Sequence, residues 1–170
     1  AKLKSVFENK NILKIGQNIK FDALMLKSYG ITVNGPFFDT MVAHHLIQPG
    51  QRHNMDYLAE IYLNYTPISI ETLIGTKGKN QGNMRDVPIE KVKEYAAEDA
   101  DITFQLKSVL ERELKKDGLT SFFNEVEMPL IEVLIEVEFN GVRIDVEELM
   151  QSGKVLESRL ITLETEIIQM

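Results

Sequence analysis

Asp99 is a carboxylate that the sequence places where charged side chains seldom lie. It falls in a long stretch of helical periodicity, and at about 100° per residue its nearest neighbours around the helix are apolar or small. An uncompensated charge there is costly, so Asp99 is expected to be paired, strongly hydrogen-bonded or bound to a metal ion. A structural Asp that answers a buried Arg or Lys is the alternative. The neighbours within about 40° of Asp99 are Val92, Thr103, Leu106 and Leu110.

Tyr95 and Asp22 are the other candidates for chemistry. Tyr95 precedes Asp99 by four residues, so its phenol is expected on the same helix face, where it could hold a water molecule. A Tyr packed in the core is the alternative. Asp22 is expected to point inward from the first turn of a helix, although the helix dipole favours an Asp there without any catalysis. Its expected neighbours on that face are Met25, Leu26 and Tyr29.

Two inward carboxylates suit a hard divalent cation. Magnesium and manganese prefer oxygen ligands, and two such ions about 4 Å apart can activate a water and stabilise the leaving oxygen in phosphodiester hydrolysis. A site of that kind needs more carboxylates than Asp22 and Asp99 alone.

The composition limits the other possibilities. The chain has no cysteine, which excludes disulfides and thiolate metal ligands. No apolar run reaches the roughly 20 residues that span a bilayer, so we expect a cytoplasmic protein with no membrane partner. The net charge is −7, but residues 1–85 hold 10 basic and 6 acidic residues, and residues 86–170 hold 9 and 20. The basic half could bind phosphate, or the charges could simply be solvated surfaces.

The elements that would position these residues make a helix-rich α/β fold. Two short strands are expected at 11–16 and 36–39, the second ending at Asp39, which could cap the next helix. The segment 66–86 reads as loop, and Val142–Ile144 is expected to be extended before Asp145 caps a last helix. The expected helices cover 19–29, 40–46, 56–63, 88–116, 121–139 and 146–170.

The last expected helix carries an apolar stripe that needs a partner. Leu149, Leu156, Leu163 and Met170 are spaced by heptads. We therefore expect 146–170 to permit self-association. Both ends of the chain look cut, as in a fragment.

Two segments resemble motifs of the family A bacterial DNA polymerases. The stretch Gly16–Asp22 (GQNIKFD) resembles the second motif of their 3'-5' exonuclease domain, and Tyr95–Asp101 (YAAEDAD) resembles the third. Segments 38–41, 52–56 and 77–81 look like the same family in the same order. Segments 127–130 and 140–145 are similar to the junction where the polymerase domain begins, so the resemblance implies an exonuclease domain over 1–120 and a connecting helix with the start of the thumb region over 121–170.

The resemblance implies a ribonuclease-H-like 3'-5' exonuclease fold that here lacks its N-terminal strands. The family has four acidic metal ligands and binds two divalent ions, Mg or Mn. Asp22 and Asp99 match two of the four ligands, and Tyr95 matches the tyrosine that orients the attacking water. The family's first motif, Asp-x-Glu, has no counterpart before Asp22, where Glu8 is the sole acidic residue. We therefore expect a truncated domain with negligible activity by itself.

The same resemblance implies contacts with the single-stranded 3' end of a primer strand. The matching residues are Gln17, Asn18, Lys20 and Arg52, whose donors can hold phosphate without reading sequence. Asn18 could instead be only a turn residue. Lys77 and Lys79 in a glycine-rich loop could also follow phosphates. His44 and His45 are adjacent, so their rings are not expected to face one metal site.

The resulting hypothesis is a metal-dependent exonuclease domain. It would remove mispaired 3' nucleotides within a polymerase of replication and repair, with the remainder of the polymerase chain as a partner. A non-catalytic scaffold or DNA-end-binding domain is the alternative, and a free-standing ribonuclease is a third reading that the polymerase-like C-terminal part disfavours.

Overall fold

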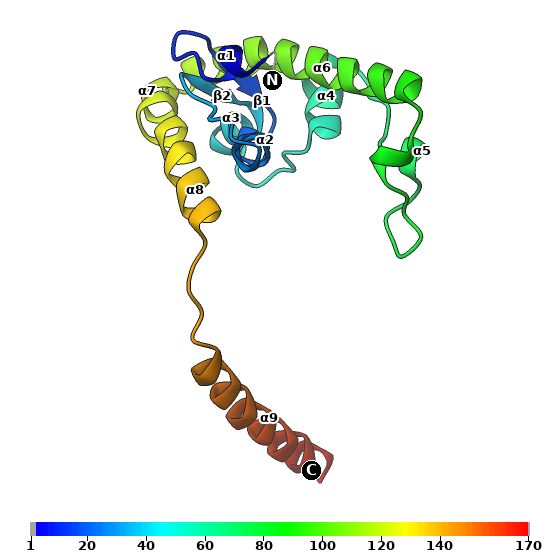
Figure 1. The fold of residues 1–170 in the computed structure, drawn as a ribbon, viewed down its shortest axis with the longest axis vertical. Coiled ribbons are helices and arrows are strands. Elements are labelled where there is room, and N and C mark those ends of the chain that lie inside the picture. Colours follow the sequence, from blue (N-terminus) through cyan, green and yellow to red (C-terminus); the bar gives the residue numbers. More distant parts are fainter. Residues whose placement is uncertain (1–2, 170) are drawn as a thin grey trace. The chain divides into compact units, whose positions relative to one another are not determined.

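The computed structural model describes residues 3–169 (Figure 1). They form two compact units, divided after Glu136. Met170 of the heptad stripe lies outside the described residues. Residues 121–136 pack with the first unit, since Phe123, Met128, Ile131 and Ile135 belong to its core. The expected boundary between the exonuclease domain and the polymerase part, after residue 120, stays a prediction, because a compact unit is not the same as a functional domain.

The elements follow the expected order in a helix-rich α/β arrangement. The first part contains α1 (Lys4–Phe7), β1 (Lys14–Gly16), α2 (Ile19–Ser28), β2 (Phe37–Asp39), α3 (Thr40–Ile47) and α4 (Met55–Leu63). The segment expected as loop contains only α5 (Glu71–Ile74) and a 3-10 turn (Met84–Asp86). The rest contains α6 (Ile89–Lys116), α7 (Thr120–Phe122), a π-helical turn (Phe123–Glu127), α8 (Met128–Asn140) and α9 (Val146–Ile168).

The two strands form a parallel sheet whose carboxyl ends meet at one edge. Lys14 pairs with Phe37 and Gly16 pairs with Asp39, and α2 connects the strands. The strand β2 runs directly into α3, and two residues separate β1 from α2, so the starts of α2 and α3 lie at the same edge. In α/β folds this is where ligands bind.

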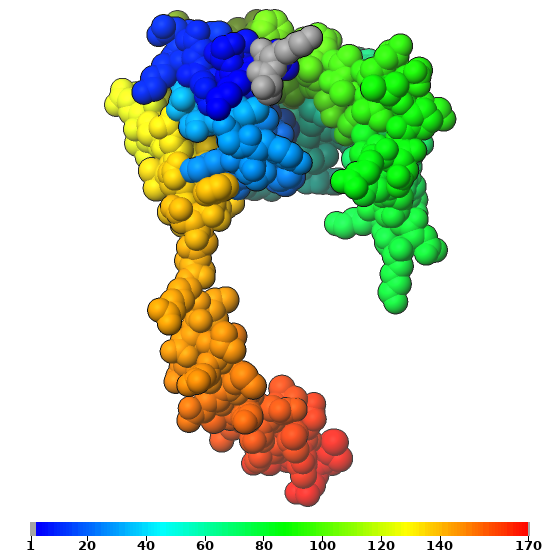
Figure 2. All heavy atoms as spheres, viewed as in Figure 1, coloured from blue at the N-terminus to red at the C-terminus, as the bar shows by residue number. Residues whose placement is uncertain are grey.

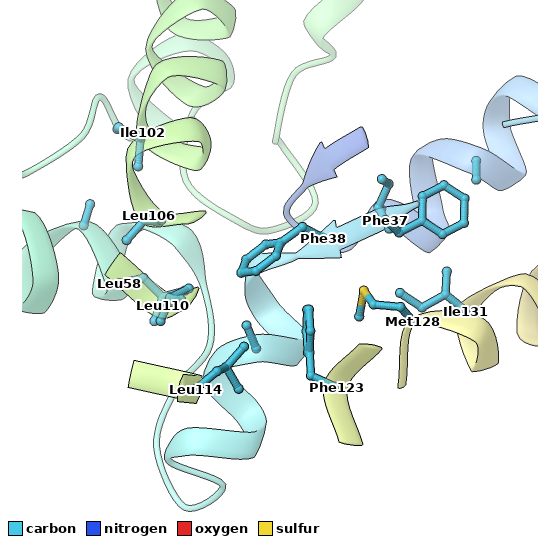
Figure 3. Close-up of a cluster of buried hydrophobic side chains, with 14 of the residues drawn as sticks. Phe37, Phe38, Leu58, Ile102, Leu106, Leu110, Leu114, Phe123, Met128 and Ile131 are labelled. Atoms are coloured by element: carbon cyan, nitrogen blue, oxygen red, sulfur yellow. The ribbon is translucent and has the colours of Figure 1, made fainter. Parts of the chain in front are cut away.

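The core is organised along α6. The strand β1 and the helices α3 and α4 contact this helix. Figure 3 shows Leu106, Leu110 and Leu114 of α6 beside Leu58. The rings of Phe38 and Phe123 lie 5.0 Å apart between their centroids and link β2 to the segment after α6. The predicted buried stripe of α6 is confirmed at Thr103, Leu106 and Leu110.

The expected single helix over 121–139 is interrupted. A π-helical turn at Phe123–Glu127 separates α7 from α8. The wider turn allows Phe123 and Met128, five residues apart, both to be buried, and α8 then continues with Ile131 and Ile135 in the core. An α-helical turn would bring residues three or four apart to one face instead.

The prediction for the inward face of α2 is wrong. Met25 is 48% exposed and Tyr29 is 80% exposed, whereas Ile19 and Ala23 are buried. The helix direction is set by the turn that leaves β1, and this turn places the small Ala23 against the core.

Unit 2 contains α9, which is capped as predicted. The Asp145 side chain accepts a hydrogen bond from the Glu148 amide at 3.1 Å. The stripe residues Leu149, Leu156 and Leu163 are all exposed. No helix among the described residues is long and apolar enough to cross a membrane.

Candidate active site

The carboxyl end of β1, the first turn of α2 and the first half of α6 border an open hollow of about 560 Å³. Its polar residues include Gln17, Asp22, Tyr95 and Asp99. Apolar side chains from several elements form the rest of its wall, namely Ile15, Met55, Met84, Val92 and Phe104. Four residues singled out in the sequence are thus brought together, and Asn18, Lys20 and Arg52 are not among the lining residues.

Asp22 reaches the hollow from the first turn of α2. The expectation that it points into the core is wrong, because the residue is exposed. Partial burial by the hollow's walls raises the pKa of its carboxyl, and the negative charge of Asp39 raises it further. Both effects disfavour the charged form of the carboxyl.

Asp99 faces the hollow from α6 and is half-buried. Its Oδ1 is buried and has no hydrogen-bond partner. Burial raises the pKa of Asp99, the nearby charges of Glu98 and Asp56 raise it as well, and a hydrogen bond from Tyr95 lowers it. Within residues 3–169 no Lys or Arg forms an ion pair with Asp99. The alternative reading, in which Asp99 is paired with a buried Arg or Lys, is therefore not supported.

Tyr95 lies one turn before Asp99 on the same side of α6. Burial, the charge of Asp99 and the hydrogen bond to Asp99 raise the pKa of the phenol to about 12. The phenol therefore stays protonated at neutral pH and acts as a hydrogen-bond donor.

The donor set suits a hard cation. Asp22 and Asp99 supply carboxylate oxygens, both with raised pKa values, and one of these oxygens is buried without a partner. A divalent ion would compensate these charges. The part of the chain that the structure describes holds no cluster of three or more His, Cys, Asp or Glu suited to a metal ion, so these two residues supply an incomplete ligand set.

The turn between β1 and α2 depends on two residues with special backbone requirements. Asn18 has a left-handed conformation, with φ of 61°. A Cβ atom at Gly16 would come within 2.9 Å of the Ile19 Cβ, so only glycine fits without a shift. The turn is closed by Asp39, which sequence reasoning identified only as a cap of α3.

Gln17 is held at both ends of its amide. The Thr40 hydroxyl donates to Gln17 Oε1, and Gln17 Nε2 donates to the His53 carbonyl at 2.6 Å. The side chain therefore ties the start of α3 to the segment before α4. Arg52 in that segment places its guanidinium 6.0 Å from the centre of the Tyr57 ring.

Three histidines meet beside this segment. His44 Nδ1 lies 2.7 Å from His53 Nδ1, and His45 Nδ1 lies 3.3 Å from His53 Nε2. Both adjacent rings thus contact His53, and they do so through its opposite ring nitrogens. Burial lowers the pKa of His44 and of His53, and the neighbouring imidazoles lower both further.

Glu98 holds the loop that follows α4 against α6, a role that the sequence did not indicate. Its carboxylate accepts from the Tyr65 hydroxyl at 2.5 Å and from the Ile68 amide at 2.7 Å. Beyond this attachment the segment with Lys77 and Lys79 projects from the rest of unit 1 (Figure 2, green). Both lysines are exposed.

Comparison with known proteins connects this arrangement to one family. A family model described as 3'-5' exonuclease matches residues 1–115. DNA polymerase I from Borreliella burgdorferi is 40% identical over 168 residues, and DNA polymerase I from Rhizobium leguminosarum is 38% identical over 167 residues. The matches cover 99% and 98% of this chain but only 18% and 16% of these relatives, so the chain spans less than a fifth of their length.

Solved structures share the fold. The POL domain of Pol1 from M. smegmatis, in complex with DNA primer-template and dNTP, matches with a TM-score of 0.69 and 24% identity over 88% of this chain and 23% of that chain. NrnC from Brucella melitensis matches with a TM-score of 0.69 and 26% identity over 83% of this chain and 65% of that chain, and it has also been solved with bound Mg2+ and bound to pGG. The expected ribonuclease-H-like exonuclease fold is confirmed.

Proposed function

Because the chain belongs to the 3'-5' exonuclease family of family A DNA polymerases, we propose that its hollow is part of a site that removes nucleotides from a DNA 3' end. The single observation that carries this proposal is the pair of carboxylates in the hollow, with the buried, unpartnered Oδ1 of Asp99. The biological role proposed is proofreading, the removal of mispaired 3'-terminal nucleotides, within a DNA polymerase I that acts in replication and repair.

Asp22 and Asp99 would hold divalent metal ions, Mg or Mn. When bound, such ions supply a nucleophile at neutral pH and compensate the charge on the leaving oxygen. Tyr95 stays protonated because its pKa is raised to about 12, so its hydroxyl can donate a hydrogen bond and orient the attacking water. Met55 and Phe104 supply part of the apolar wall beside the carboxylates.

The proposed DNA contacts are Gln17, Asn18, Lys20 and Arg52. Gln17 lines the hollow, although the protein already engages both ends of its amide. Asn18 and Arg52 lie on the exposed surface, where they could contact phosphates of the single-stranded 3' end. The proposed protein partner is the remainder of a polymerase chain. The proposed location is the cytoplasm. Residues 146–170 are proposed to self-associate.

A metal-binding experiment tests the carboxylate pair. Paramagnetic Mn2+, added to the 170-residue chain, is expected to broaden NMR signals of Asp22 and Asp99 first, and Asp99→Asn is expected to weaken binding by at least about tenfold, the loss of one charged ligand. Asp101→Asn is the matched control, because Asp101 is exposed and bonded to Gln105 on the same helix. Equal Mn2+ affinity in Asp99→Asn and Asp101→Asn would contradict the proposal.

An activity assay separates the enzyme from the scaffold alternative. Within these 170 residues no Asp-x-Glu precedes Asp22, so the chain by itself is expected to bind a single-stranded 3' end with negligible hydrolysis in Mn2+. Joining a strand with Asp-x-Glu from a relative to its N-terminus is expected to produce 3' nucleotide release. Binding without any release in the joined chain would favour the DNA-end-binding scaffold.

A further inference from the structure

We propose that Asp39 is a positioning residue whose buried carboxylate holds the turn that sets Asp22 in the hollow. The inference rests on the proposed function, in which Asp22 binds metal. Asp39 is 1% exposed and is not among the residues that line the hollow, so it acts through the backbone of α2.

The carboxylate of Asp39 accepts hydrogen bonds from the starts of two helices. Oδ2 accepts from the Ile19 amide at 2.7 Å, the shortest of the four contacts. Oδ1 accepts from the amides of Met41 at 2.9 Å and Val42 at 3.2 Å, and from Asn18 at 3.2 Å. An ordinary N-cap of α3 needs only Met41 and Val42. The other two bonds run to the start of α2, about twenty residues away in the chain.

The bonds from Asn18 and Ile19 to Asp39 supply the N-terminal capping that α2 does not obtain from its own N-cap residue. Asn18 is the N-cap of α2, but its own side chain forms no capping hydrogen bond and its backbone is left-handed. Asp39 therefore caps α2 from a different element. Asp22 follows Ile19 by three residues in the first turn, so the direction of its side chain depends on the turn that Asp39 fixes.

The pairing of the strands keeps Asp39 in place for this role. Gly16 lies opposite Asp39 in the parallel sheet, at the ends where both strands turn into helices. Thr40 adds a second tie, since its hydroxyl donates to Gln17. The β2–α3 junction thus holds the β1–α2 junction through both Asp39 and Thr40.

The substitution Asp39→Asn separates the two roles. An amide placed with its oxygen at the Oδ1 position keeps the bonds to Met41 and Val42, and its NH2 group then faces the Ile19 amide, donor against donor. In the metal-free chain, hydrogen exchange at Ile19 is expected to accelerate at least about tenfold while exchange at Met41 stays within about twofold. The Asp22 backbone signals are expected to shift, and the Mn2+ dissociation constant is expected to rise about tenfold.

Two further variants separate the position of the carboxylate from its charge. Asp39→Glu keeps the charge but displaces the carboxylate, so it is expected to weaken Mn2+ binding as well; full Mn2+ affinity in this variant would show that charge alone matters and would overturn the proposal. Asp145→Asn changes a capping Asp in unit 2 and is expected to leave the Asp22 signals unchanged.

The outcomes distinguish this inference from the proposed function. Equal acceleration at Ile19 and Met41, or unshifted Asp22 signals in Asp39→Asn, would overturn the positioning role. Lack of Mn2+ broadening at Asp22 in the unsubstituted chain would contradict the proposed metal site, and the exchange pattern at Ile19 would still decide the role of Asp39.

Discussion

Asp99 keeps one carboxylate oxygen away from solvent without a hydrogen-bond partner, which destabilises the metal-free chain. The raised pKa of Asp99 also indicates that its ionised form destabilises the folded state, since the folded state binds the proton more tightly than the unfolded chain does. The resulting penalty is absent below the unfolded pKa and complete above the folded pKa. Stability therefore falls as pH rises through this window.

Asp99→Asn is expected to remove that penalty. At pH 7 the free energy of unfolding in urea should rise by up to about 1 kcal/mol, a limit set by solvent screening of a half-exposed group. Near pH 3.5 the variant and the unsubstituted chain should differ less. A variant that is less stable than the unsubstituted chain at pH 7 would show that Asp99 has a stabilising partner.

Tyr95→Phe is expected to raise the pKa of Asp99 further, because the hydrogen bond from Tyr95 lowers it. Carbon-detected NMR titration of the Asp99 carboxyl measures this change. Tyr29→Phe is the control, since Tyr29 is 80% exposed and lies just after α2. An unchanged Asp99 titration in Tyr95→Phe would mean that the hydrogen bond from Tyr95 does not influence this pKa.

At the level of elements, the turn from β1 to α2 is the most constrained segment. Gly16→Ala would bring a Cβ within 2.9 Å of the Ile19 Cβ, which is close to the backbone and cannot rotate away. We expect a loss of about 1–3 kcal/mol in unfolding free energy, as in other overpacked sites. Gly153→Ala is the control, because a Cβ there meets nothing within 4 Å and should favour helix α9. Equal stabilities would show that the turn can relax.

Element types and order were readable from the sequence, because strong local signals determine them. Pro88 and Gly118 bracket α6, and the caps Asp39 and Asp145 mark the starts of α3 and α9. The exposed face of α2 was not readable. Its amphipathic pattern is weak, and the turn before it decides which residues are buried.

The site was only partly readable for a similar reason. Asp22, Tyr95 and Asp99 could be named because they match motif positions, and the structure places all three around one hollow. The double capping by Asp39 joins segments about twenty residues apart, and the attachment of Ile68 to Glu98 joins segments thirty apart. Contacts at such separations depend on tertiary packing, which leaves no periodic signal in the chain.

At the level of the whole molecule, the histidine cluster predicts sensitivity to acid. The folded pKa values of His44 and His53 are lowered, so the unfolded chain binds more protons and stability falls as pH drops below about 6.5. His53→Gln is expected to reduce the slope of the unfolding free energy against pH. Each histidine affected contributes less than about 1.4 kcal/mol per pH unit to that slope. Urea unfolding at pH 5.5 and 7.5 measures it, and an unchanged slope would place the acid sensitivity elsewhere.

The apolar stripe of α9 predicts association between copies of the chain. Leu156 is 69% exposed and Leu163 is 42% exposed, and burying such side chains stabilises an interface. Light scattering is expected to show a mass that rises with concentration, and Leu156→Glu is expected to restore the monomer mass. Ser158→Glu, outside the stripe, should not. A monomer at high concentration in the unsubstituted chain would contradict self-association.

The π-helical turn at Phe123–Glu127 adds one residue to the joint between α7 and α8. Deleting one residue there would convert the turn to an ordinary α-helical one, in which Phe123 and Met128 would be four positions apart and would still share one helix face. Met128, Ile131 and Ile135 would therefore keep their places in the core. Relatives that lack the extra residue are expected to show the same apolar positions along α8, one residue closer to Phe123, whereas a further deletion would rotate α8 by about 100° and would have to be accompanied by a shifted hydrophobic pattern.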